Sequence, residues 1–203
     1  MRHAESAEIL AVAVNSSEAA LPAVDRKSTV RTLVIGYGNP DRQDDGGAYQ
    51  VINALRQRLG QASLSEEETG LDHLGHGADT DSVLVMQLVP ELLDTAAEYE
   101  QIVFVDAHAG ADGDDLQCTP VQPAYGSAAF THHMTPAMFL ALLQVLYHRE
   151  PAGTIVSIRG QRFDFAPGRR ELSAVTGALV EPAVQQIMRL LAESYTPADG
   201  GVS

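Results

Sequence analysis

The sequence predicts an α/β protein in which a mostly parallel sheet is covered by helices on both faces. Short runs of β-branched residues alternate with stretches whose apolar residues recur at helical spacing. The run 102–105 is apolar at every position, which is typical of a strand buried on both faces. Strands that alternate with helices favour parallel pairing, because each helix carries the chain back to the same end of the sheet.

The predicted elements follow one another along residues 30–193. Strands are expected at 30–35, 82–86, 102–105 and 154–158, with an edge strand at 116–121. Pro120 gives that strand its edge position, because proline cannot donate to a sheet ladder. Helices are expected at 45–59, 90–97, 135–148 and 173–193. In the last of these, Pro182 marks either a new start or a kink.

Length and composition indicate one domain. The 203 residues are 45% hydrophobic, which allows a sizeable core. We expect an N-terminal extension over 1–29, a single α/β domain over 30–195 with an acidic, flexible insertion at 61–82, and a tail over 196–203.

The net charge of −14 disfavours nucleic acid and anionic membranes as partners, since both attract basic surfaces. Cys118 is the single cysteine, so no internal disulfide can form and a cytoplasmic location is expected. No run approaches the roughly 20 apolar residues of a membrane span.

Polar clusters lie just after predicted strands or just before predicted helices. The first is 36–40 with Asp44 and Asp45, the second holds Asp106 and His108, and the third is His132 with His133. Ligands of parallel sheets bind beyond the carboxyl ends of the strands, where these clusters meet. Two carboxylates and one imidazole suit a divalent transition metal.

Each cluster also has a plainer interpretation. The loop 36–40 lacks the third glycine of a dinucleotide fingerprint, because Asp41 stands at that position, so we consider nucleotide binding remote. Asp44 and Asp45 suit a helix cap, and the two roles divide if Asp44 caps while Asp45 faces the cleft. His108 is a loop histidine or a support for Asp106, and the paired histidines are ligands or ordinary surface residues.

Six segments resemble, in order along the chain, motifs of the [NiFe]-hydrogenase maturation endopeptidases, and the last two, 157–160 and 170–173, follow the closing pattern of the family. Residues 33–46 (LVIGYGNPDRQDDG) resemble the first motif of the family, and 103–107 (VFVDA) its second acidic motif. Residues 131–136 (THHMTP) resemble its histidine motif. Residues 87–92 (QLVPEL) are similar to a segment of the branch that serves soluble, bidirectional NAD-linked hydrogenases.

The resemblance implies a three-layer α/β/α sandwich and an aspartic-type endopeptidase. Such an enzyme removes a C-terminal peptide from the hydrogenase large-subunit precursor after nickel insertion. The implied nickel ligands are Asp45, Asp106 and His132, with His133 as the fallback, and the two aspartates are also the implied catalytic residues. Asp45 stands where the best-known branch has glutamate.

The implied partner is the large-subunit precursor, and we expect nickel to arrive with it rather than to be held by the free enzyme. The alternative function is a non-catalytic, nickel-sensing assembly chaperone for the large subunit. The candidate substrate-binding residues are Gly38, Asn39, Gln87 and Glu91.

Overall fold

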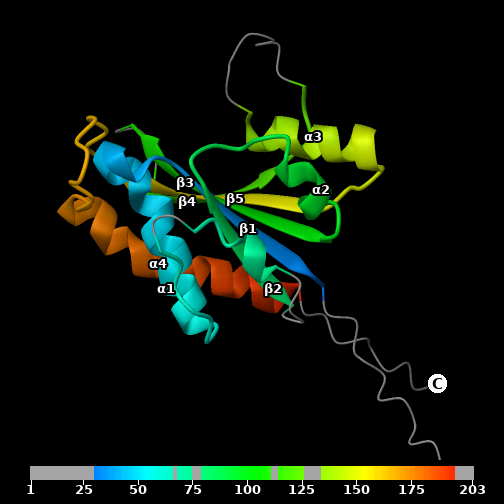
Figure 1. The fold of residues 1–203 in the computed structure, drawn as a ribbon, viewed down its shortest axis with the longest axis horizontal. Helices are drawn as coiled ribbons and strands as arrows, with labels where there is room; N and C mark the ends of the chain where they lie inside the picture. Colours follow the sequence, from blue (N-terminus) through cyan, green and yellow to red (C-terminus); the bar gives the residue numbers. More distant parts are fainter. Residues whose placement is uncertain (1–29, 66–67, 75–78, 111–113, 126–133, 195–203) are drawn as a thin grey trace, which may run out of the picture.

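A five-stranded sheet forms the centre of the protein in the computed structural model, which describes residues 30–65, 68–74, 79–110, 114–125 and 134–194. The strand order is β2-β1-β3-β5-β4 (Figure 1). Four strands run parallel, and β4 pairs antiparallel with β5 at one edge. The strands are β1 (Thr32–Tyr37), β2 (Thr80–Val85), β3 (Gln101–Ala109), β4 (Leu116–Val121) and β5 (Ala152–Gly160). The predicted mostly parallel sheet and the edge strand at 116–121 are confirmed.

Helices cover both faces of the sheet, which gives the predicted three layers (Figure 1). Helices α1 (Gly47–Arg58) and α4 (Ala174–Glu193) lie on one face. Helices α2 (Leu92–Ala96) and α3 (Pro136–Tyr147) lie on the other. Two short 3₁₀ segments, η1 (Pro40–Gly46) and η2 (Leu71–His73), complete the elements. Within the described ranges, no helix is long and apolar enough to cross a membrane.

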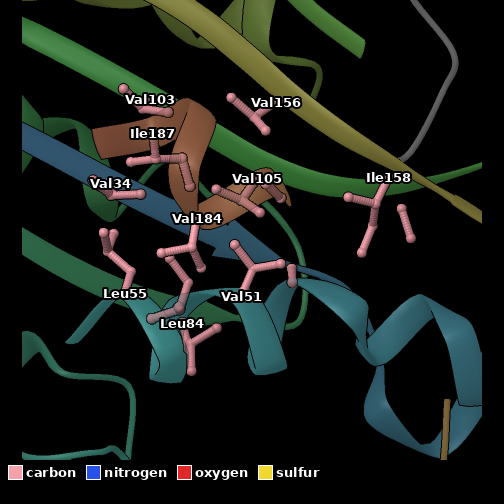
Figure 2. Packing of buried hydrophobic residues seen from close by; sticks show 14 of the residues in the cluster. Val34, Val51, Leu55, Leu84, Val103, Val105, Val156, Ile158, Val184 and Ile187 are labelled. Carbon is pink, nitrogen blue, oxygen red and sulfur yellow. The ribbon is translucent and has the colours of Figure 1, made fainter. Parts of the chain in front are cut away.

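The apolar run in β3 is buried on both faces, as its composition predicts. Val103 and Val105 point toward α1 and α4, where Figure 2 shows them above Val51 and Val184. Residues of the opposite parity, such as Phe104, pack toward α2 and α3. The ring of Phe104 meets that of Phe139 edge to face at 5.8 Å. Alternate side chains of β3 therefore contribute to two separate hydrophobic cores, one on each face of the sheet.

Three features differ from the sequence prediction. Asp106 lies within β3 rather than after it, because β5 continues to pair with β3 as far as Ala109. Pro182 lies inside one continuous α4 and starts no new helix, since buried residues such as Thr176 and Ile187 anchor the helix on both sides of it. Within 61–82, Leu64 is 3% exposed and belongs to the core that includes residues of α1, so this segment is not wholly solvated.

Candidate active site

The crevice between β1 and β3 is where the topology of the sheet changes direction. The chain leaves β1 for β2 on one side, whereas β3 and β5 extend the sheet on the other. Connections that diverge in this way open a crevice at the carboxyl ends of the strands. Asp45 follows β1 through η1, and Asp106 lies one residue beyond the last β1–β3 pair, Gly36 with Val105.

The loop after β1 folds back on itself and so presents the carboxylate of Asp45. The backbone N–H of Asn39 donates to Oδ2 of Asp45 at 3.0 Å. The side chain of Asn39 caps η1 by accepting from the N–H of Asp41 at 2.9 Å. Gly38 has φ +145°, and a Cβ there would collide with the carbonyl oxygen of Asp45. Only glycine allows this close approach of the two backbones.

Asp106 is half-buried, and two groups fix its carboxylate. Its Oδ1 accepts from the N–H of Ala107 at 2.7 Å, and the Tyr37 hydroxyl donates a second hydrogen bond. Burial raises the pKa of Asp106 to about 6, and the negative charge of Asp45 acts in the same direction, against the two hydrogen bonds. Burial and the charge of Asp106 also raise the pKa of the Tyr37 phenol well above its usual range, so Tyr37 remains a donor.

Asp44 has a structural role different from the helix cap that the sequence suggested. Helix α1 begins after Gly46 without any side-chain cap. The carboxylate of Asp44 is 0% exposed and instead accepts from the backbone N–H groups of Gln161, Arg162 and Ser173. Asp44 therefore ties η1 to the segment between β5 and α4, while Asp45 is the acid of the pair that belongs to the crevice.

Of the predicted ligands, Asp45 and Asp106 lie close enough for the charge of Asp45 to act on Asp106. His132 and His133 lie outside the described residues. Among the residues that are described, no group of three His, Cys, Asp or Glu side chains is placed to hold a metal ion. Gln87 and Glu91 are exposed in the connection between β2 and α2, at the same end of the sheet as the crevice.

His108 is a strand residue, not a loop histidine. It lies in β3 two residues after Asp106 and so on the same face of the sheet. Its Nδ1 is 2.8 Å from the hydroxyl of Ser157, and its Nε2 is 3.3 Å from the amide nitrogen of Gln117. Both ring nitrogens of His108 therefore have a polar partner from a neighbouring strand or from β4.

These side chains extend the site into a polar row that crosses four strands. Tyr37 lies on β1, His108 shares β3 with Asp106, Ser157 lies on β5 and Gln117 on β4. Sequence reasoning missed Tyr37 and Ser157 as site residues. The signal available was the period-2 spacing of Asp106 and His108, which predicts one polar face at that end of the strand.

The fold and site together define an α/β protein with two adjacent carboxylates in the crevice of its sheet. The solved structures that it resembles include [NiFe] hydrogenase maturation proteases. HybD from E. coli, a hydrogenase maturating endopeptidase, is 20% identical with a TM-score of 0.58, over 81% of this chain and 94% of its own. HybD from Thermococcus kodakarensis is 18% identical with a TM-score of 0.54, over 79% of this chain and 99% of its own.

A third structure, an endopeptidase from Escherichia coli, is 20% identical with a TM-score of 0.56, over 82% of this chain and 95% of its own. No protein-family model and no curated protein matches the sequence. At this level of identity the similarity shows a shared fold. The fold is the one implied by the motifs at 33–46 and 103–107.

Proposed function

We propose that this chain is a maturation endopeptidase that removes a C-terminal peptide from a [NiFe]-hydrogenase large-subunit precursor after nickel insertion. A fold by itself does not determine function, so the proposal depends on the site. The observation that carries it is the juxtaposition of Asp45 and Asp106 in the crevice of a fold that named maturation proteases share.

Nickel enters this proposal as part of the substrate. Carboxylate oxygens and an imidazole suit a divalent transition metal, and we assign that role to Asp45, Asp106 and His132, with His133 as the fallback. Gripping the precursor through its metal would hold the scissile peptide beside the crevice, which lowers the entropic cost of the reaction. A precursor without nickel would lack this grip and would not be cut.

Burial makes Asp106 a stronger base than an ordinary aspartate. A carboxyl with a pKa of about 6 accepts a proton more readily than an exposed aspartate, and it is still ionised at neutral pH. Tyr37 and Ala107 orient its carboxylate. Whether it binds nickel or takes a proton from the attacking water, Asp106 acts in its ionised form.

Gly38, Asn39, Gln87 and Glu91 are the residues that we propose to contact the precursor, because they lie in the connections that border the crevice. A cytoplasmic location fits this role and is supported by the single cysteine, Cys118.

The test compares nickel-loaded with nickel-free precursor from the same organism, and reads the C-terminus by intact mass. We expect cleavage of the loaded form alone. Asp106→Asn should lower kcat/KM by at least about 10²-fold, the scale of general acid–base catalysis. The matched control is Asp94→Asn, an exposed carboxylate on α2, which should leave cleavage unchanged.

Two outcomes would refute the proposal. Equal cleavage of both precursors would show that nickel is not needed for recognition. Full activity of Asp106→Asn would show that Asp106 does not belong to the active site. A stable complex with the loaded precursor whose C-terminus stays intact would favour the assembly chaperone instead.

A further inference from the structure

The geometry points to a substrate subsite beside the acidic pair: an apolar pocket that receives one aliphatic side chain of the precursor segment being cut. The pocket has a volume of about 500 Å³, including the part open to solvent. This inference rests on the proposed function, because its occupant belongs to the same precursor. The pocket is lined by residues that include Tyr37, Gly38, Pro40, Leu84, Met86 and Glu68.

The pocket and the acidic pair share a wall. Tyr37 lines the pocket, and its hydroxyl donates to Asp106. Gly38 lines it as well, and the backbone of Asp45 folds directly over this glycine. Adjacent residues of an extended peptide are about 3.3–3.6 Å apart, so a peptide bond held at the carboxylates brings its near neighbours to this wall.

The chemistry of the pocket favours an aliphatic occupant. Pro40, Leu84 and Met86 supply aliphatic walls, and the Met86 side chain is 65% exposed. Methionine is flexible and polarisable, so it adapts to the shape of an apolar partner. Covering Met86 with a second apolar side chain removes both from water, which favours binding.

The polar groups of the pocket already have partners within the protein. The Tyr49 hydroxyl donates to the carbonyl of Leu64 at 2.8 Å. A carboxylate oxygen of Glu68 accepts from the N–H of Ser65 at 2.7 Å. Because these hydrogen bonds form within the protein, neither Tyr49 nor Glu68 needs a hydrogen bond from the occupant.

The experiment is a double-mutant cycle between the pocket and the precursor. Once mass spectrometry has located the cut, each of the three residues on either side is replaced by alanine in turn. The nickel-loaded precursors are then cut by the wild type, by Met86→Ser and by Thr69→Trp, which fills the pocket from an exposed position. The control is Leu146→Ser, which removes a similarly exposed apolar side chain from α3.

At one precursor position, truncation should raise KM about tenfold with the wild type, the scale of a lost aliphatic contact. The same truncation should change KM little with Met86→Ser or Thr69→Trp, because the altered pocket no longer makes a favourable apolar contact with that side chain. The Leu146→Ser control should behave like the wild type. A response at a basic precursor residue, in place of an aliphatic one, would overturn the assignment.

Direct binding of uncut precursor separates this inference from the proposed function. Binding that depends on Met86 while no cutting occurs would refute the peptidase and support the pocket. Normal cutting with the same truncation profile for the wild type, Met86→Ser and Thr69→Trp would refute the pocket and leave the peptidase standing.

Discussion

Replacing Asp44 by asparagine is expected to destabilise the protein by about 2–4 kcal/mol. The buried carboxylate accepts the N–H groups of Gln161 at 2.8 Å, Arg162 at 2.9 Å and Ser173 at 2.6 Å. In the variant an amide nitrogen replaces one carboxylate oxygen, so at least one N–H faces another donor. A hydrogen bond to a charged group contributes about 1.5–3 kcal/mol, and an unpaired buried donor costs a further 1–3 kcal/mol or so.

The same carboxylate predicts how stability depends on pH. Burial alone would raise the pKa of Asp44, but the donors from Ser173, Gln161 and Arg162 outweigh it and lower the pKa from 3.8 to about 2. Because the folded pKa lies below the unfolded one, the stabilisation is complete above the unfolded pKa and is lost as the pH falls through both values. The shift corresponds to about 2 kcal/mol at 1.36 kcal/mol per pKa unit.

Urea denaturation at neutral pH and at several pH values below 5 tests both statements. The free energy of unfolding of Asp44→Asn should be lower than that of the wild type at neutral pH, and the gap should narrow by about 2 kcal/mol as the pH falls toward 2. Asp164→Asn, an exposed carboxylate in the same segment, should stay within about 0.5 kcal/mol of the wild type. A variant as stable as the wild type, or a gap that is independent of pH, would refute this account of Asp44.

Two further predictions concern the crevice. Tyr37→Phe removes a hydrogen bond that lowers the pKa of Asp106, so the acid limb of the pH–rate profile should move to higher pH while the thermal midpoint changes little. Gly38→Ala adds a Cβ that collides with the Asp45 carbonyl, at φ +145°. It should lower both the free energy of unfolding and cleavage, and full retention of both by the alanine variant would contradict the proposed loop geometry.

Local sequence patterns predicted the elements of the fold well where burial decides the structure. The run 102–105 is apolar throughout and becomes the buried part of β3. The continuation of β3 to Ala109 was not predictable in the same way, because it depends on backbone pairing with β5 roughly 50 residues along the chain. Likewise, Pro182 reads locally as a break, whereas packing on the sheet and α1 keeps α4 continuous.

Some features of the site were likewise predictable from local sequence, whereas others depend on contacts between distant parts of the chain. Asp45 and Asp106 were predicted to meet because both follow parallel strands, a rule that needs only the order of the elements. The role of Tyr37 depends on the register of β1 against β3, which places it beside Asp106. The partners of Asp44 come from 117–129 residues away, so no local pattern distinguishes it from a helix cap.

The number of backbone donors separates the roles of these carboxylates. Asp44 is the most buried of them, yet three backbone N–H groups keep its pKa near 2, so it serves as a fixed anchor. Asp106 has one backbone donor and one phenol, so burial and the charge of Asp45 prevail and its pKa rises to about 6. A carboxylate with few donors stays available for a proton or a metal.

Asp44 and Asp45 are both positioned by the short 3₁₀ segment η1. Gln43 has φ 54° and ψ −108°, a conformation that costs an L residue about 1–3 kcal/mol. Such a conformation persists only where neighbouring contacts fix it. Here Asp44, the next residue, is fixed by hydrogen bonds from the N–H groups of Gln161 and Ser173. Asn39 holds the other end by donating to Asp45. The strained turn, fixed by these hydrogen bonds, keeps the side chain of Asp44 in the interior and that of Asp45 in the crevice. Two neighbouring aspartates therefore have different roles, one structural and one in the site.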